Sequence, residues 1–318
     1  MYAIDLRDIR AAQERIAPYA HVTPVLTSRT MDELSGRSLF FKCENLQRVG
    51  AFKFRGAMNA VAKLDEETAK RGVVTHSSGN HAQALALAAR IRGIPAFIVM
   101  PTNAPEVKRQ AVLGYGANVI PCAPTQAARE ETAARVARDT GGVFVPPYDH
   151  PDVIAGQGTI ALELFASHPD LDAVIVPVGG GGMISGIALA YREIAPRVRV
   201  IGAEPLDADD ASRSKAGGVL VPQAGTQTVA DGLRTSLGAL TWPVVRDVVH
   251  RIETVSEEAI VSAMRLVFER MKLVIEASAA VGVAVALGAR LREDEKRVGV
   301  VLCGGNVDLD ALPFVASR

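Results

Sequence analysis

A lysine flanked by two phenylalanines is the first feature of the sequence that could do chemistry. The stretch AFKFRGAMNA, residues 51–60, places Lys53 between Phe52 and Phe54. Burial among apolar groups disfavours an ammonium ion and makes a lysine amine a better nucleophile. A lysine stem can also lie along apolar surface with its charge in water. The stretch alone leaves both interpretations open, and other residues have to decide between them.

A run of glycines lies between a strand-like stretch and a helical pattern. In VIVPVGGGGMISGIALAY, residues 174–191, the run consists of Gly179, Gly180, Gly181 and Gly182. Open backbone amides at a helix N-terminus, together with the helix dipole, favour a phosphate group. The spacing differs from a nucleotide-triphosphate loop and fits the dinucleotide pattern only loosely. A plain tight turn needs one or two glycines, so the longer run predicts a phosphate cradle.

A second loop between a strand and a helix carries polar side chains. THSSGNHAQALALAARI contains Ser77, Ser78, Gly79, Asn80 and His81 in succession. Two hydroxyls, an amide and open N–H groups at a helix start suit a carboxylate or a phenolic oxygen. A simple helix cap would need one serine. The histidine is a further substrate-binding candidate, although a lone histidine in such a loop is more often a structural partner.

Two more loops at strand ends carry groups that could bind a ligand. Cys303 in GVVLCGGNVD could hydrogen-bond a heteroaromatic nitrogen, or it could be a small buried hydrophobic residue. AEPLDADD places Glu204, Ala208 and Asp210 in one loop. Carboxylates and a carbonyl suit Mg²⁺ or Ca²⁺, but a solvated acidic loop has the same composition. The amine, the phosphate cradle, the carboxylate loop and the ring-nitrogen donor together match pyridoxal 5′-phosphate.

The amino-acid composition excludes some classes of binding partner. The chain has 318 residues with 35 Lys plus Arg and 35 Asp plus Glu, so no basic surface indicates nucleic acid or an anionic membrane. Three cysteines without a Cys-x-x-Cys pair indicate a reducing, cytoplasmic location. The N-terminus is charged and amphipathic, so we expect no signal peptide. The longest apolar stretches are too short and too rich in glycine and alanine to span a membrane.

Alternating patterns predict the elements that must position these residues. Short β-branched runs alternate with helical patterns, first over residues 72–142 and again from residue 172. This alternation predicts βαβ units, hence an α/β fold with parallel sheets. Ligands in such folds lie beyond the carboxyl ends of the strands, where the polar loops occur. The stretch FVPPYDHPDVIAGQGT, residues 144–159, predicts a crossing between two lobes with a cleft beside it.

Six stretches in order resemble one family. The chain resembles the fold type II pyridoxal-phosphate enzymes, close to the serine racemase and serine/threonine dehydratase branch, over nearly its whole length. The stretches are TPVLTSRTMDELSGRSLFFKCENLQRVGAFKFRGAMNA, THSSGNHAQALALAA, FVPPYDHPDVIAGQGTIALE, VPVGGGGMISGIA, ERMKLVIEASAAVGVA and LCGGNVD. The resemblance implies a tryptophan synthase β-like fold, with a mostly parallel sheet flanked by helices in each of two lobes. We expect a large cofactor-binding domain at 1–71 and 150–318 and a small mobile domain at 72–149, whose closure would exclude water.

The resemblance also implies roles for single residues. Lys53 would carry the cofactor, with Phe52 against its ring and Asn80 on its 3′-oxygen. The glycine run and the Met183 amide would hold the phosphate, and Cys303 would face the ring nitrogen. Close racemases and threonine dehydratases more often have serine at the cysteine position. A neutral thiol does not keep the ring nitrogen protonated as an aspartate would, which favours elimination.

The reaction that we expect is β-elimination from L-threonine or L-serine, giving a 2-oxo acid and ammonia. Lys53 would act as base, and Ser77 and Ser78 would bind the substrate carboxylate. L-threo-3-hydroxyaspartate is a third candidate, for which Arg129 would bind the second carboxylate unless it is an exposed helix arginine. Many threonine dehydratases have alanine in place of Ser78. In racemases this serine faces the lysine across the ring, so the alternative is a serine racemase with these two residues as bases.

Two other functional classes agree less well with these residues. A nicotinamide-dependent dehydrogenase would have no role for Lys53 and the SSGN loop. A non-catalytic amino-acid sensor would bind its ligand without releasing ammonia. The resemblance to serine racemases extends to the acidic loop, where the family binds a divalent cation. It also implies a homodimer.

Four residues of this chain also match positions that bind ATP in animal serine racemases, although such polar residues do not establish ATP as an effector. These positions are Gln83, Tyr115, Lys272 and Asn306.

Overall fold

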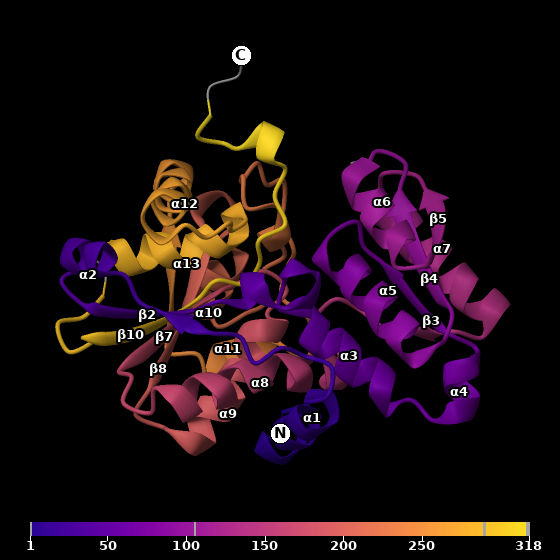
Figure 1. The fold of residues 1–318 in the computed structure, drawn as a ribbon, viewed down its shortest axis with the longest axis horizontal. Coiled ribbons are helices and arrows are strands. Elements are labelled where there is room, and N and C mark those ends of the chain that lie inside the picture. The colour runs from indigo at the N-terminus through magenta and orange to yellow at the C-terminus, as the bar shows by residue number, and fades with distance from the viewer. Residues whose placement is uncertain (1, 105, 289–290, 316–318) are drawn as a thin grey trace.

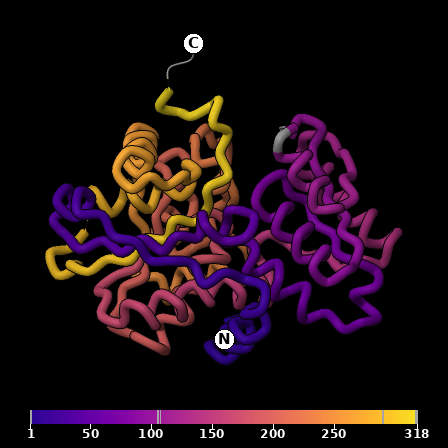
Figure 2. Tube along the Cα trace, in the orientation of Figure 1, coloured from indigo at the N-terminus to yellow at the C-terminus, as the bar shows by residue number. Residues whose placement is uncertain are grey.

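Two sheets of unequal size lie side by side in the computed structural model, which describes residues 2–104, 106–288 and 291–315 (Figure 1). The chain passes from the large lobe into the small lobe after helix α3 and returns before helix α8 (Figure 2). Each sheet is flanked by helices. The predicted α/β fold with mostly parallel sheets is therefore confirmed.

The large lobe contains a six-stranded sheet in the order β1-β2-β10-β7-β8-β9, which is parallel except for the β1–β2 pair. The central strands are almost entirely buried because helices cover both faces. The strands are β1 (Val25–Leu26), β2 (Ser38–Lys42), β7 (Ala173–Pro177), β8 (Arg199–Pro205), β9 (Arg251–Val255) and β10 (Arg297–Val301).

Helices α2, α12 and α13 lie on one side of this sheet, and α1, α8, α9 and α11 lie on the other (Figure 1). Helix α10 follows β8 and contacts β9. The bounds are α1 (Leu6–Ile16), α2 (Arg29–Ser35), α8 (Pro151–Ser167), α9 (Gly182–Ile194), α10 (Asp210–Gly217), α11 (Trp242–Asp247), α12 (Glu257–Met271) and α13 (Ala277–Leu287).

The small lobe contains a four-stranded parallel sheet in the order β5-β4-β3-β6. Its strands are β3 (Val73–His76), β4 (Ala96–Pro101), β5 (Asn118–Cys122) and β6 (Val143–Phe144). Its helices are α4 (Glu66–Lys70), α5 (Asn80–Arg92), α6 (Glu106–Gly114) and α7 (Gln126–Thr140). The polar SSGN loop connects β3 with α5, as the sequence pattern predicts.

Helix α3 (Lys53–Lys63) joins the two lobes, because it packs against α5 on one side and α8 on the other. Its Phe54 belongs to the same apolar core as Ile98 of the small sheet. Toward α8 the backbones approach closely, since a Cβ added at Gly156 would lie 2.6 Å from the Arg55 carbonyl oxygen. The predicted division of the chain at residues 72 and 149 stays a prediction.

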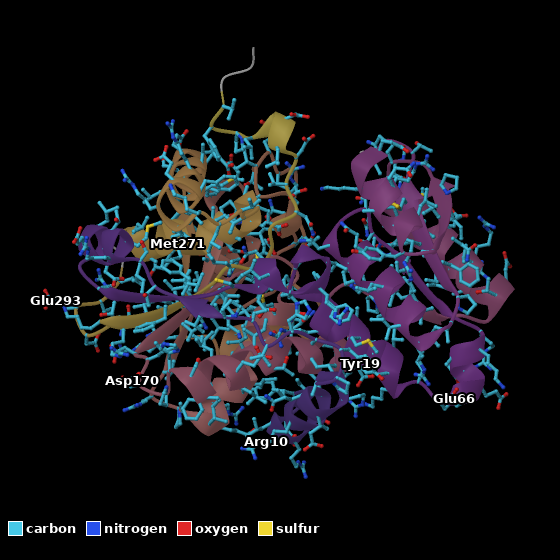
Figure 3. The ribbon with its side chains drawn as sticks, in the orientation of Figure 1. Arg10, Tyr19, Glu66, Asp170, Met271 and Glu293 are labelled. Carbon is cyan, nitrogen blue, oxygen red and sulfur yellow. The ribbon has the colours of Figure 1, made fainter. Side chains whose placement is uncertain are left out.

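The outer surface of both lobes carries charged side chains. Arg10, Glu66, Asp170 and Glu293 are exposed and lie at the periphery of the molecule (Figure 3). Among the described residues, no helix combines the length and the apolar character that a membrane span requires.

Candidate active site

A cavity of about 430 Å³ lies between the lobes, where the carboxyl ends of β3, β7 and β10 meet the start of α3. It brings together residues from distant parts of the chain, including all the predicted cofactor-binding and substrate-binding residues. These are Phe52, Lys53, Ser77, Ser78, Asn80, His81, Arg129, Gly179, Gly180, Gly181, Gly182, Met183 and Cys303.

Lys53 is the first residue of α3, and its amine lies in an apolar corner of the cavity. Its Nζ donates a hydrogen bond to the Pro147 carbonyl oxygen at 2.5 Å. The same atom is 5.0 Å from the ring centroid of Phe52 and 6.0 Å from that of Tyr148. Burial lowers the pKa of Lys53 to about 8, although Cys303 and Glu276 act in the opposite direction. The amine is therefore much closer to its neutral, basic form at pH 7 than a surface lysine is.

The glycine run forms the turn from β7 into α9, and it leaves no room for side chains. Gly181 has φ +83°, a conformation that favours glycine. A Cβ at Gly180 would lie 2.3 Å from the Tyr148 ring, and one at Gly182 would lie 3.0 Å from the Tyr148 carbonyl oxygen. The geometry thus places bare backbone and a helix N-terminus at the cavity wall, as the sequence predicts for a phosphate cradle.

In the SSGN loop, the side chains of Ser77 and His81 each form a hydrogen bond with a backbone group. The Gly79 N–H donates to Ser77 Oγ at 3.3 Å. His81 is 2% exposed, and its Nε2 lies 2.9 Å from the Val145 carbonyl oxygen, so this nitrogen carries the proton. Burial lowers the pKa of His81 to about 3. A neutral histidine fixed in this way supports the structural interpretation of His81.

Glu276 lies at the N-cap of α13 and lines the cavity, although no sequence motif predicts a role for it. Asn80 Nδ2 donates to both carboxylate oxygens of Glu276 at 3.0 Å, and Asn306 Nδ2 donates to Asn80 Oδ1 at 2.8 Å. These contacts fix which end of the Asn80 amide is the donor. A single glutamate at a helix start resembles an ordinary residue of a helix N-terminus, so no local pattern distinguishes Glu276.

Cys303 and Glu276 lie next to each other in the cavity, and burial shifts the pKa values of both. Cys303 Sγ lies 4.0 Å from Glu276 Oε1. Burial raises the pKa of Cys303 well above its usual value, so the thiol stays neutral. Burial also raises the pKa of Glu276 to about 7. The cavity therefore offers a neutral thiol, as the sequence analysis expects, beside a carboxyl group that titrates near neutral pH.

Arg129, on α7, reaches the cavity from the small lobe. Its Nε atom is buried and has no hydrogen-bond partner among the described residues. A buried guanidinium donor without an acceptor is costly, and a carboxylate is the acceptor that fits it best. Arg129 is half-buried, so the alternative of an exposed helix arginine does not describe its position.

The acidic loop lies outside this cavity, at the end of β8. Glu204 and Asp210 are fully buried. Glu204 accepts the N–H groups of Ala211 and Ser212 at 3.1 and 2.8 Å, and Asp210 Oδ2 accepts the Leu237 N–H at 3.3 Å. Asp210 Oδ1 is buried and has no partner among the described residues.

The described part of the chain contains no cluster of three or more Asp, Glu, His or Cys side chains that could hold a metal. The predicted donors are two carboxylates and the carbonyl of Ala208, which lies in the short 3₁₀ helix Leu206–Ala208. Burial raises the pKa of Glu204 well above its usual value and that of Asp210 to about 6. Two buried carboxylates with a free oxygen fit a hard cation, whose charge would offset their desolvation.

The residues that match ATP-binding positions are in part engaged with the protein. Asn306 Nδ2 donates to the Val49 carbonyl as well as to Asn80. Lys272 Nζ donates to the Glu269 carbonyl at 2.6 Å. Gln83 is 8% exposed. These contacts do not test whether ATP binds, which stays an open prediction.

Comparison with known proteins identifies the family. A model of the family described as pyridoxal-phosphate dependent enzyme matches residues 16–304. The chain belongs to this family. It is 53% identical over 316 residues to a serine racemase of Arabidopsis thaliana, with 98% of this chain and 96% of that protein covered. It is 51% identical over 314 residues to a β-hydroxyaspartate dehydratase of Paracoccus denitrificans, with 99% and 100% covered.

Among solved structures, maize serine racemase superimposes with a TM-score of 0.95 at 48% identity, covering 97% of this chain and 95% of that one. The predicted membership of the serine racemase and dehydratase group is thus confirmed, and the chain is a pyridoxal-phosphate-dependent enzyme. Both predicted reactions, elimination and racemisation, fit these relatives.

Proposed function

We propose that the enzyme removes water from a small L-β-hydroxy amino acid and releases a 2-oxo acid and ammonia. The observation that carries this proposal is the buried Lys53 amine, which shares one cavity with the glycine cradle and the SSGN loop. Its lowered pKa suits a group that accepts a proton near neutral pH. The relatives named as dehydratase and racemase agree with chemistry at the α-carbon of an amino acid.

Different groups of cavity residues would bind the cofactor, bind the substrate and transfer the proton. When bound, pyridoxal 5′-phosphate withdraws electrons from the substrate α-carbon. The glycine run and the Met183 amide would hold its phosphate, and Asn80 Nδ2 would donate to its 3′-oxygen. Ser77 and Ser78 would hold the substrate carboxylate, and Lys53 Nζ would take the α-proton. Loss of that proton and of the β-hydroxyl gives an enamine, which water hydrolyses to the 2-oxo acid and ammonia.

Among L-serine, L-threonine and L-threo-3-hydroxyaspartate, Arg129 favours the third. Arg129 lines the cavity that also contains the SSGN loop, and its buried Nε has no hydrogen-bond partner among the described residues. The two carboxylates of a dicarboxylic substrate could therefore bind at separate places. The 51% identity to a β-hydroxyaspartate dehydratase supports the same choice. Serine lacks the second carboxylate and would leave Arg129 without its partner.

The substitution Arg129→Met is expected to lower kcat/KM for L-threo-3-hydroxyaspartate by about 10- to 100-fold, because a hydrogen bond to a charged group is lost. The rate with L-serine should change much less. Arg138→Met is the matched control, since Arg138 is exposed on the same helix. Steady-state assays of 2-oxo acid release measure both values. Equal losses with the two substrates would contradict the assignment of Arg129.

Racemisation is the second candidate, and the presence of Ser78 in the same cavity as Lys53 favours it. If both residues exchange protons at the α-carbon, Ser78→Ala should abolish formation of the D-isomer and spare elimination. Chiral chromatography of the products, alongside a 2-oxo acid assay, measures the two reactions separately. A variant that loses both in equal proportion would show that Ser78 acts in binding alone.

We further propose that the acidic loop binds Mg²⁺ or Ca²⁺ through Glu204, Asp210 and the Ala208 carbonyl. The unpartnered Asp210 Oδ1 and the burial of both carboxylates support this site. The bound cation would hold β8 and α10 together, close to the Leu237 backbone that Asp210 already contacts. We also propose a homodimer, which the family resemblance implies, and a cytoplasmic location, which three cysteines without a Cys-x-x-Cys pair indicate.

Addition of Mg²⁺ is expected to raise the melting temperature, because a ligand at 100 times its Kd stabilises the fold by about 2.7 kcal/mol. Asp210→Asn should remove the response to Mg²⁺. Asp207→Asn should keep it, since Asp207 is an exposed member of the same loop. Thermal denaturation with and without Mg²⁺ or Ca²⁺ measures the effect. An unchanged melting temperature of the wild-type protein with either ion would rule out the site.

A further inference from the structure

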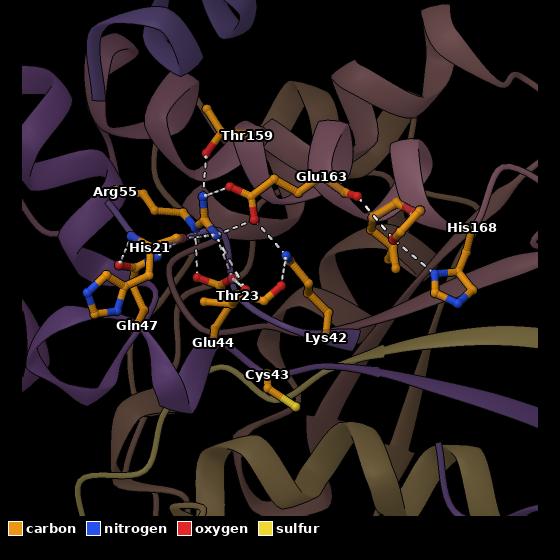
Figure 4. A network of polar contacts seen from close by, with 12 residues as sticks. His21, Thr23, Lys42, Cys43, Glu44, Gln47, Arg55, Thr159, Glu163 and His168 are labelled. Carbon is orange, nitrogen blue, oxygen red and sulfur yellow. Dashed lines mark hydrogen bonds and ion pairs between the residues drawn. The ribbon is translucent and has the colours of Figure 1, made fainter. Parts of the chain in front are cut away.

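A buried ion-pair network surrounds Arg55 in the first turn of α3 (Figure 4). Arg55 is fully buried and donates to both oxygens of Glu44, at 2.7 and 2.8 Å. It also donates to both oxygens of Glu163, at 2.6 and 2.8 Å. Lys42 Nζ donates to Glu163 at 2.6 Å. We call these four side chains the Arg55 network.

The network is balanced in charge, and its guanidinium is fully hydrogen-bonded. Two cations face two carboxylates, and Thr159 Oγ1 accepts from Arg55 Nη1 at 3.2 Å. All five N–H groups of the guanidinium therefore have an acceptor. Thr23 Oγ1 donates to Glu44 at 2.5 Å, and the Thr23 carbonyl accepts from Lys42 at 2.7 Å. Burial would lower the pKa of Arg55, but Glu44 and Glu163 outweigh it and raise that pKa.

The network ties the first turn of α3 to three other elements. Lys42 ends β2, Glu44 begins the 3₁₀ helix Glu44–Leu46, and Glu163 lies on α8. Arg55 follows Lys53 by two positions, which is about 200° around a helix. The two side chains therefore leave the helix on nearly opposite sides. Lys53 reaches the cavity while Arg55 reaches the protein interior.

The start of α3 is also held by contacts outside the network, because Phe54 is fully buried and the Gly56 N–H donates to Gln157 Oε1 at 3.2 Å. Its N-cap is Phe52, and no side chain caps the helix there. The Phe52 N–H donates to the Cys303 carbonyl at 3.0 Å, which anchors the backbone one residue before Lys53. The Arg55 network adds a charged side-chain anchor two residues after Lys53.

We propose that the Arg55 network positions the Lys53 amine in the cavity, which makes Arg55 a positioning residue for the reaction. Buried ion pairs are often no more stabilising than apolar side chains of the same volume, so stability alone does not explain four charged groups here. Paired bidentate contacts do fix orientation, and a catalytic amine has to be held within about 0.5 Å of its working position. The inference rests on the proposed role of Lys53 but not on the identity of the substrate.

The test compares Arg55→Lys with a matched control in the holoenzyme. Arg55→Lys keeps the charge but cannot make two bidentate contacts. The control is Arg251→Lys, because Arg251 makes a bidentate contact with the buried Glu295 at 2.7 Å, on strand β9 rather than near α3. The readouts are the melting temperature, kcat and KM, the rate of cofactor dissociation, and the visible circular dichroism per bound cofactor.

Arg55→Lys is expected to lower kcat by about tenfold or more with little change in KM, because small displacements of a catalytic group have large effects. Cofactor dissociation should become faster, and the circular dichroism should weaken as the cofactor is held less rigidly. Arg251→Lys should lower the melting temperature and leave the other readouts within about twofold of the wild type, since distant sites act independently.

A second variant keeps the test decisive if Arg55→Lys does not fold. Glu163→Gln keeps the shape of the side chain and removes one charge, and the same changes are expected from it. The proposal is overturned if the Arg55 and Arg251 variants change all readouts alike, or if the Arg55 variant only melts earlier. Failure of the role of Lys53 itself is distinguishable, because Lys53→Ala would then retain activity.

Discussion

Replacing Lys53 with alanine is expected to lower kcat by about 10⁴-fold, the upper end of the range for loss of a general base. The amine is the cavity group whose lowered pKa suits proton removal, and its contact with the Pro147 carbonyl aims it at the cavity. The free amine has a pKa of about 8, so kcat of the wild-type protein should fall about tenfold per pH unit below pH 8 and level off above it.

Lys63→Ala is the matched control for this prediction. Lys63 is the last residue of the same helix, and its exposed amine pairs with Asp152 at 2.6 Å. An exposed ion pair contributes little, so this variant should keep the wild-type rate. The pH dependence of kcat for both variants completes the measurement. If Lys53→Ala turned over at the wild-type rate, the proposed mechanism would be wrong.

The second large effect is expected from Gly181→Ala, which should lower the affinity for pyridoxal 5′-phosphate by at least about tenfold. Gly181 has φ +83°, where an alanine costs about 1–2 kcal/mol. The added Cβ would also lie 2.7 Å from Leu237 Cδ2 and 2.9 Å from Thr241 Oγ1. Relief of these contacts has to move the turn that would hold the phosphate. Equilibrium titration with the cofactor measures the loss.

Gly218→Ala is the control that separates the effect of backbone strain from the effect of moving the glycine turn between β7 and α9. Gly218 has φ +69° at the C-cap of α10, and a Cβ there meets nothing within 4 Å. We expect a lower melting temperature and an unchanged cofactor affinity for this variant. If both variants weaken the cofactor equally, or if neither does, the glycine run is not the phosphate cradle.

Much of the candidate site follows from local sequence and one rule of topology. Lys53, the SSGN loop, the glycine run and Cys303 were predicted because each lies next to a strand or helix end with a recognisable pattern. Parallel strands present their carboxyl ends at one edge of a sheet, so the glycine run and Cys303, which follow β7 and β10, had to lie close together. The SSGN loop follows β3 of the other sheet, and the packing of the two lobes brings it to the same cavity. The same rule predicts the two sheets, whose alternating patterns are clear in the sequence.

The remainder depends on tertiary contacts that have no local signature. Asn80 and Glu276 are 196 positions apart, and Arg55 and Glu163 are 108 positions apart. A buried glutamate or arginine looks the same in the sequence as an exposed one. The orientation of α7 likewise decides whether Arg129 faces water or the cavity, and its helical pattern does not contain that information. Packing against β3 and β4 sets it.

An assay of the purified holoenzyme tests the central claim most directly. L-serine, L-threonine and L-threo-3-hydroxyaspartate would be compared in the presence of Mg²⁺, with 2-oxo acid and D-isomer followed in the same samples. We predict that 2-oxo acid is the main product and that L-threo-3-hydroxyaspartate gives the highest kcat/KM. Accumulation of D-serine with little 2-oxo acid would contradict the proposed elimination and identify racemisation as the main activity.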